Sequence, residues 1–200
     1  AYCARQGATE CVAKQFRCYT PFQLRRYLET LEMNRLAEVL ARRFTAALGG
    51  RAARVEFLPT WLFVKTDEVP AGATVGADEL AAMFQDNVYF VEPFVGGAFA
   101  KFSDNTGHFD DAEEAELPHC FSHWTLVATR GELVVVDLQG VVRPRKNLYV
   151  LTDPAIHHRS LSRFYFTSTS HGSPGIAAFK AQHRCNRFCR ELGLPDPALL

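Results

Sequence analysis

The chain has 200 residues, 48% of them hydrophobic, and its 22 Lys and Arg balance 22 Asp and Glu. This length suffices for one large domain or two small lobes, and the zero net charge gives no electrostatic reason to bind nucleic acid or an anionic membrane. Six cysteines are too few for a disulfide scaffold, and no segment resembles a signal peptide or a membrane span, so we expect a soluble protein in a reducing, cytoplasmic compartment.

The first part of the chain predicts a strand, a long helix and a broken strand. Residues 8–18 alternate apolar and polar side chains, as a strand does. A helix is expected over 20–49, because Thr20 can cap it, leucines recur at helical spacing and two glycines end it. Residues 54–65 indicate a strand interrupted at Pro59. The sequence does not open with Met, so we expect flanking domains of a longer chain.

The middle of the chain predicts a crossover between two lobes. A turn is expected over 70–76 and a short helix over 78–84. Residues 87–95 are rich in β-forming side chains and precede Gly96-Gly97, whose backbone freedom suits a crossover. The acidic run over 110–116 predicts a solvated loop.

Two buried strands in the second half each lead into a carboxylate. The apolar run over 133–136 runs into Asp137, and a second run over 148–151 runs into Asp153. A basic loop over 143–146 separates them. Two adjacent strands that each deliver a carboxylate at one end would form a cation site.

Asp137, Gln139 and Asp153 form the candidate magnesium site. Mg²⁺ prefers hard oxygen ligands, and a remaining carboxylate can accept the proton of an attacking hydroxyl. The set therefore suits phosphoryl transfer. The alternative is that both aspartates are ordinary turn residues.

Residues 175–192 predict a final helix that carries a candidate zinc site. On that helix Cys185 and Cys189 would stack at positions i and i+4, with His183 swinging in from the preceding turn. The candidates for a fourth ligand are His119, His123, His157 and His158. His123 is attractive because we expect it to begin the strand pair that the helix covers. The alternative is two half-buried free cysteines beside a surface histidine.

Two weaker signals concern a nucleotide. Lys14 lies in the first predicted strand, where a lysine can neutralise phosphates, and a solvated lysine is the ordinary alternative. Residues 172–175 precede the final helix and can present backbone N–H groups to an anion, with a plain loop as the alternative. The glycine-rich loop and the short triplets of conventional protein kinases are absent, and no G-x-S-x-G elbow supports a hydrolase.

Taken in order, the segments resemble the alpha-kinases, a family of atypical protein kinases that includes myosin heavy chain kinases, elongation factor 2 kinase and channel-linked kinases. The matching segments run through the whole chain: VAKQF at 12–16, VEPF at 91–94, KFSDNTG at 101–107, FSH at 121–123, DLQGV at 137–141, LTDP at 151–154 and HRCNRFC at 183–189. Each is short, and their order makes the set specific.

The resemblance implies an α+β, two-lobed, atypical protein-kinase-like fold that transfers the γ-phosphate of ATP to a Ser or Thr hydroxyl of a protein substrate. Lys14 would contact the ATP phosphates, and Glu92 would lie in the adenine-binding hinge. Gln139 and Asp153 would hold Mg²⁺, while Asp137 would orient or deprotonate the substrate hydroxyl.

The resemblance also implies a structural zinc that tethers the C-terminal helix, with His123 as the fourth ligand beside His183, Cys185 and Cys189. It divides the chain into an N-terminal lobe over 1–90, incomplete at its start, and a C-terminal catalytic lobe with the zinc site over 91–200.

The loop before the last helix departs from the family pattern, because Thr167 follows Phe166 and Ser170-His171 stand before Gly172. The positions that keep the pattern of this substrate or phosphate loop are Thr169, Gly172 and Gly175. A catalytically silent binding or scaffolding module is therefore the alternative function. The intact acidic set favours the enzyme.

Overall fold

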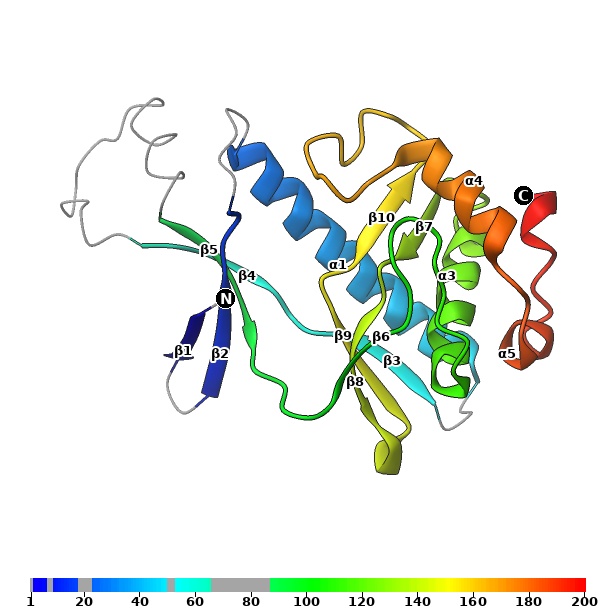
Figure 1. Cartoon of the computed structure of the whole chain (residues 1–200), viewed down its shortest axis with the longest axis horizontal. Coiled ribbons are helices and arrows are strands. Elements are labelled where there is room, and N and C mark those ends of the chain that lie inside the picture. Colours follow the sequence, from blue (N-terminus) through cyan, green and yellow to red (C-terminus); the bar gives the residue numbers. More distant parts are fainter. Residues whose placement is uncertain (1, 7–8, 18–22, 50–52, 66–86) are drawn as a thin grey trace.

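The computed structural model describes residues 2–6, 9–17, 23–49, 53–65 and 87–200. Strands and helices alternate irregularly along it, as in an α+β fold (Figure 1). The first elements are β1 (Tyr2–Gln6), β2 (Thr9–Lys14), α1 (Gln23–Ala47), β3 (Arg54–Phe57), β4 (Trp61–Val64), β5 (Val88–Pro93) and β6 (Phe99–Lys101). Then follow η1 (Glu113–Ala115), α3 (Glu116–Ala128), β7 (Leu133–Val136), β8 (Gln139–Arg143), η2 (Pro144–Lys146), β9 (Leu148–Thr152), β10 (Ala155–His158), α4 (Gly172–Gln182), α5 (Arg187–Glu191) and η3 (Pro197–Leu199).

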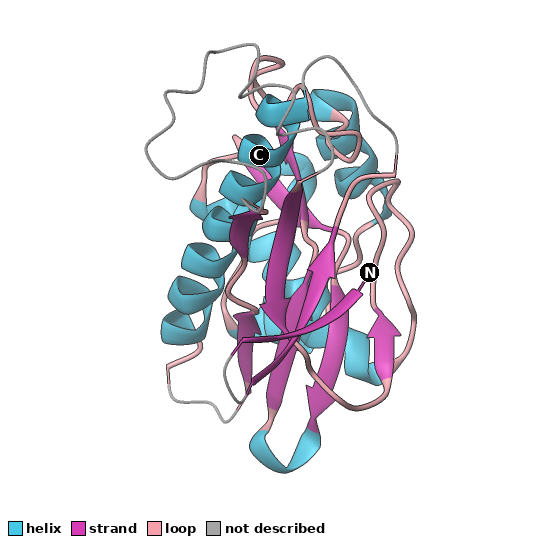
Figure 2. Cartoon of the chain, turned by 90° about the vertical axis from the view of Figure 1, so that its left-hand side faces the viewer, coloured by secondary structure: helices cyan, strands magenta, loops and turns pink. Residues whose placement is uncertain are grey.

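The described strands form three sheets. One has the order β1-β2-β5-β4, a second has the order β3-β9-β8-β6, and β10 pairs with β7. Figure 2 shows the strands in magenta and the helices in cyan. The pairing of β3 with β9 is parallel, and the other pairs are antiparallel. Because β3 precedes residue 90, a segment of the first half completes a sheet of the second half. The division into lobes at residue 90 stays a prediction.

Helix α1 packs against strands of two sheets. Tyr27 near its start clusters with Val88 and Phe90 of β5, whereas Phe44 near its end joins the main core with Val55 of β3. The predicted helix is confirmed, but its buried face differs in part from the predicted leucine stripe: Leu40 and Phe44 are buried, whereas Leu28 is exposed. A 25-residue helix therefore connects the two regions as a rigid rod.

The prediction around residues 110–123 was wrong in part. Glu116 begins α3, and His123 lies inside that helix, not at the start of a strand pair. Pro118 in the first turn and apolar residues at helical spacing are the signals that identify this helix. Acidic side chains of the run lie in η1 and in the first turn of α3, where the helix dipole favours negative charge.

The single helix predicted over 175–192 is also wrong, because it is two helices. Helix α4 ends at Gln182, His183 is extended, and α5 begins at Arg187. The Asn186 side chain caps α5 by accepting hydrogen bonds from the backbone N–H groups of Phe188 at 3.0 Å and Cys189 at 3.3 Å. A local cap thus overrides the continuous helical pattern.

The predicted turn over 70–76 and the short helix over 78–84 lie outside the described residues. Among the residues that the structure describes, no helix combines the length and the apolar character needed to cross a membrane.

Gly140 fixes the pairing of β8 with β9. A Cβ atom at this position would lie 2.0 Å from the Val150 carbonyl oxygen, which is backbone and cannot move aside. Gly140→Ala should therefore lower the free energy of unfolding by about 2 kcal/mol or more in urea denaturation. Gly96→Ala is the control, since the nearest atom to its Cβ would be 3.8 Å away. Equal midpoints for the two variants would contradict this account.

Candidate active site and candidate metal centre

Lys14 is the centre of a polar cluster that joins two sheets. Its Nζ atom lies 2.5 Å from Glu92 Oε1 and 2.6 Å from Asp153 Oδ2. The Thr152 hydroxyl donates to Glu92 Oε2 at 2.6 Å and lies 3.3 Å from Lys14 Nζ. The Glu92 side chain is 6% exposed and that of Asp153 is 51% exposed. A nearly buried carboxylate therefore has both a cation and a hydroxyl as partners.

Strand pairing accounts for this convergence. In the β2–β5 pair, Val12 lies opposite Glu92, which places Lys14 further along the same strand. In the β8–β9 pair, Gln139 lies opposite Thr152. The first residue of β8 is thus brought beside the end of β9, one position before Asp153. The predicted acidic set lies together because an antiparallel hairpin places these strand ends at one edge.

Both aspartates of the predicted set have backbone dihedral angles that are uncommon for residues other than glycine. Asp137 has φ of 58° and Asp153 has φ of 48°, in the left-handed region. Such angles cost energy and concentrate at functional sites. The Oδ1 atom of Asp137 lies 2.8 Å from Lys101 Nζ, although it accepts no well-aligned hydrogen bond from the described residues. Lys101 in β6 is a partner that the sequence analysis did not single out.

Two pockets meet at Asp153. The first, which we call the nucleotide-side pocket, is lined by Lys14 and Glu92 at one end and by mostly apolar side chains elsewhere. These are Val12, Leu58, Pro93, Phe94, Val95, Phe99, Val141 and Val150, with Gly140, Thr152 and Asp153. It lies between the β1-β2-β5-β4 sheet and the strands β6, β8 and β9. An apolar pocket with a few convergent charges is a typical ligand site.

The second pocket, which we call the acceptor-side pocket, contains both aspartates. Its lining residues are Phe16, Arg26, Thr30, Met33, Asn34, Asp137, Asp153, Pro154, Thr167, Ser168 and Thr169. Asp153 lines both pockets, so the two pockets adjoin at this residue.

The three residues predicted for a substrate or phosphate loop lie in two different parts of the structure. Thr169 lines the acceptor-side pocket, whereas Gly172 and Gly175 lie in the first turn of α4. A Cβ atom at Gly175 would lie 2.4 Å from the His157 ring, so this glycine permits α4 to approach β10.

His157 is a residue whose position sequence reasoning missed, since it was considered only as a zinc ligand. It is 1% exposed, its Nε2 donates to the Asn105 carbonyl at 2.9 Å, and its Nδ1 accepts from the His171 N–H at 3.0 Å. Burial lowers its pKa to about 4. A neutral imidazole therefore joins the loop at Asn105 to the segment that carries Thr169. The Thr169 carbonyl also accepts a hydrogen bond from Asn105 Nδ2 at 3.0 Å.

The four predicted zinc ligands lie together. Their ligand atoms, from His123, His183, Cys185 and Cys189, all lie within 4.8 Å of one another. Cys185 Sγ is 3.8 Å from His123 Nδ1, and Cys189 Sγ is 3.6 Å from His183 Nε2. The break between α4 and α5 makes this possible, because Cys185 lies before α5 and does not stack on Cys189 along one helix.

The chemistry of these donors suits zinc. His123 Nε2 donates to the Pro195 carbonyl at 2.9 Å, which leaves Nδ1 as a lone pair directed at Cys185. A hydrogen bond with the Cys120 thiol lowers the pKa of Cys189, and the two histidines add to this effect. Burial raises the pKa of Cys185, so a thiolate there needs a nearby cation. Two sulfurs and two imidazole nitrogens are a common structural zinc set.

Comparisons with known proteins identify the family. The alpha-kinase family model matches residues 3–189, nearly the whole chain. The chain belongs to the alpha-kinase family. The alpha-protein kinase vwkA of Dictyostelium discoideum is 40% identical over 112 residues, which are 56% of this chain and 17% of that protein. The chain therefore spans a small part of this curated relative.

Solved structures agree with the fold of this alpha-kinase chain. An alpha kinase from Entamoeba histolytica superposes with a TM-score of 0.77 at 32% identity, covering 94% of this chain and 70% of that one. The alpha-kinase domain of myosin heavy chain kinase A, complexed with ADP, gives a TM-score of 0.71 at 26% identity, covering 94% of this chain and 65% of that one.

The buried neutral His157 should make stability depend on pH. The unfolded chain protonates this imidazole below about pH 6.5, whereas the folded chain does so only near pH 4. Its contribution to stability is therefore complete above pH 6.5 and is lost as the pH falls to 4. Between pH 7.5 and 4.5, we expect wild type to lose about 2.5 kcal/mol more unfolding free energy than His157→Gln.

Urea denaturation at both pH values measures this difference. His108→Gln is the comparison variant, because it removes a histidine that is exposed. Parallel losses in wild type and His157→Gln would show that His157 does not titrate abnormally.

Proposed function

We propose that this chain is the catalytic domain of an ATP-dependent protein kinase that phosphorylates Ser or Thr hydroxyls. The observation that carries the proposal is the junction of the two pockets at Asp153, with Lys14 on one side and Asp137 on the other. Phosphoryl transfer needs a cation-lined phosphate site beside an acceptor site, and little covalent chemistry from the protein. The two pockets that adjoin at Asp153 would provide the phosphate site and the acceptor site side by side.

In this proposal the nucleotide-side pocket binds ATP. Its apolar walls suit an adenine ring, and Lys14, which also lines it, would neutralise phosphates. Glu92 would lie in the hinge that binds adenine. Its carboxylate contacts the Lys14 ammonium directly. The myosin heavy chain kinase A domain has been solved with ADP, and two forms that each have one Asp replaced by Ala are described as inactive in complex with ATP. These relatives support both the ligand and a role for aspartates.

Magnesium would be held by Gln139 and Asp153, whose hard oxygens lie at adjacent strand ends. Bound there, the cation would neutralise charge on the phosphates. Asp137 would accept the proton of the substrate hydroxyl in the acceptor-side pocket. Lys101 would position that carboxylate, which it contacts at 2.8 Å. The protein would thus contribute to catalysis by positioning the phosphates and the substrate hydroxyl and by compensating the phosphate charge.

The proposal includes a structural zinc bound by His123, His183, Cys185 and Cys189. Zinc would join α3 to the segment between α4 and α5, which a second contact already supports: Asn186 Nδ2 donates to the Glu116 carbonyl at 2.6 Å. A cytoplasmic setting would keep these thiols reduced and available to the metal.

Replacing either aspartate should abolish transfer without unfolding the chain. Asp137→Ala removes the proton acceptor and Asp153→Ala removes a cation ligand, so each should slow phosphate transfer from Mg-ATP to casein by about 10²-fold or more. Asp111→Ala is the control, because Asp111 is exposed and lies outside both pockets.

Circular dichroism should show the same helix content in all three variants. If both active-site variants transfer phosphate as wild type does, the assigned mechanism is wrong. A folded wild type that transfers nothing would favour the silent binding module.

Removing the metal should loosen the C-terminal helices. We expect one zinc per chain by atomic absorption, and a chelator should lower the thermal midpoint and expose the core around Cys189. Cys185→Ala should lose the zinc, because a thiolate ligand is gone. Cys11→Ala, at a buried cysteine outside the cluster, should keep the metal even if it costs stability. Full zinc content in Cys185→Ala would remove that residue from the ligand set.

A further inference from the structure

The acceptor-side pocket is lined by hydroxyls of the chain itself. Three consecutive hydroxyl residues, at positions 167–169, form part of its wall together with Asp137 and Asp153. Thr167 is buried and its Oγ1 donates to the Phe164 carbonyl at 2.8 Å. Ser168, in contrast, is exposed. Thr169 is half-buried, so Ser168 is the most exposed of the three in the pocket where a substrate hydroxyl would be phosphorylated.

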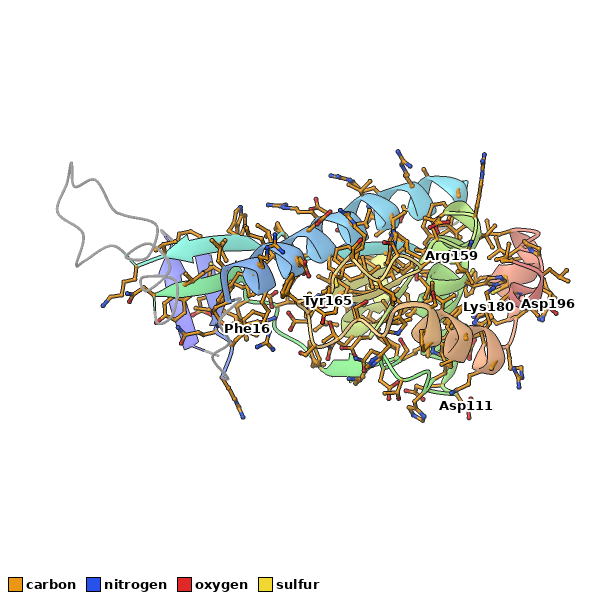
Figure 3. The ribbon with its side chains drawn as sticks, turned by 90° about the horizontal axis from the view of Figure 1, so that it is seen from above. Phe16, Asp111, Arg159, Tyr165, Lys180 and Asp196 are labelled. Carbon is orange, nitrogen blue, oxygen red and sulfur yellow. The ribbon has the colours of Figure 1, made fainter. Side chains whose placement is uncertain are left out.

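The segment that carries Ser168 is fixed against α1. Glu29 Oε2 accepts a hydrogen bond from the Phe166 N–H at 2.8 Å, and Arg163 forms an ion pair with Glu32. Tyr165 of this segment lies beside α1 (Figure 3). These contacts, on the N-terminal side of Ser168, fix the segment and so hold the Ser168 hydroxyl at the pocket.

A cation already contacts this hydroxyl. Arg26 Nη2 donates to Ser168 Oγ at 3.2 Å, and the Arg26 guanidinium lies 3.8 Å above the Phe16 ring. On the same turn of α1, the Arg25 guanidinium lies over the Phe166 ring. An arginine beside a serine oxygen is the arrangement that stabilises a phosphate placed on that oxygen, by charge-assisted hydrogen bonds.

We propose that Ser168 is an autophosphorylation site, modified by the active site of its own chain and then held by Arg26. The inference rests on the proposed kinase function. It is carried by the exposure of Ser168, by its place in the wall shared with Asp137 and Asp153, and by its hydrogen bond with Arg26.

The chemical step balances without a further reactant. Ser168 Oγ attacks the γ-phosphorus of ATP, the new O–P bond forms, and the bond to the β-phosphate oxygen breaks to release ADP. The hydroxyl proton passes to Asp137. The product phosphate is dianionic, so the carboxylates of Asp137 and Asp153 would repel it while Arg26 attracts it. The phosphoserine should therefore turn toward α1.

The test follows both self-labelling and transfer to casein in one reaction with Mg-ATP. Phosphorylated residues are mapped by tandem mass spectrometry in wild type, Ser168→Ala, Ser162→Ala and Asp137→Ala. Ser162 is the matched control, an exposed serine of the same segment that does not line the pocket. We expect phosphate on Ser168 in wild type and Ser162→Ala, loss of most self-incorporated label in Ser168→Ala, and none in Asp137→Ala.

Dilution distinguishes modification within one chain from modification between chains. The labelled fraction at a given time should not change with protein concentration, and active chains should not label Ser168 of a mass-tagged Asp137→Ala chain. Labelled casein without phosphate on Ser168 would overturn this inference and leave the kinase proposal standing. Label on Ser168 of the inactive chain would overturn the intramolecular step. The absence of label on both casein and the chain would overturn the proposed function, and this inference with it.

Discussion

The position of the Lys14 ammonium between two carboxylates is the constraint on which the site depends. Glu92 comes from β5 and Asp153 follows β9, so one side chain of β2 joins strands of two different sheets. Because Glu92 is almost buried, leaving it without a cation would cost several kcal/mol. The contacts that join the two sheets run from Lys14 to Asp153 and from the Thr152 hydroxyl to Glu92. The nucleotide-side pocket lies between the sheets that these contacts join.

The parts of the site that could be predicted from the sequence are those set by local pairing. Asp137 lies just before β8 begins and Asp153 just after β9 ends, so the antiparallel β8–β9 pair brings them to one edge. The apolar runs over 133–136 and 148–151, which were predicted to be adjacent strands, lie in different sheets. The contact between Lys14 and Asp153 joins residues 139 positions apart, and no local pattern specifies it. His157 was missed for a similar reason, since its partners belong to two separate loops.

The cluster of His123, His183, Cys185 and Cys189 lies together although the local structure predicted for it was wrong. The spacing of Cys185 and Cys189 predicted stacking on one helix, and the apolar pattern of residues 175–192 supported that helix. The cap made by Asn186 divides it instead. In physical terms, a side-chain oxygen that satisfies two backbone N–H groups outweighs the weak preference of the flanking residues for helix. His123 lies in α3, and the acidic run at the N-terminal end of this helix was predicted to be a loop.

The same network explains why nucleotide and cation would bind together. Phosphates that reach Lys14 compete with its two carboxylates, and the competition is unequal. Glu92 is nearly buried and also holds the Thr152 hydroxyl, so moving it would leave a desolvated charge. Asp153 is half-exposed and can turn to water or to a cation at little cost. In the proposed mechanism, ATP phosphates at Lys14 would release the Asp153 carboxylate, and Asp153 would then be available to hold Mg²⁺ where the two pockets adjoin.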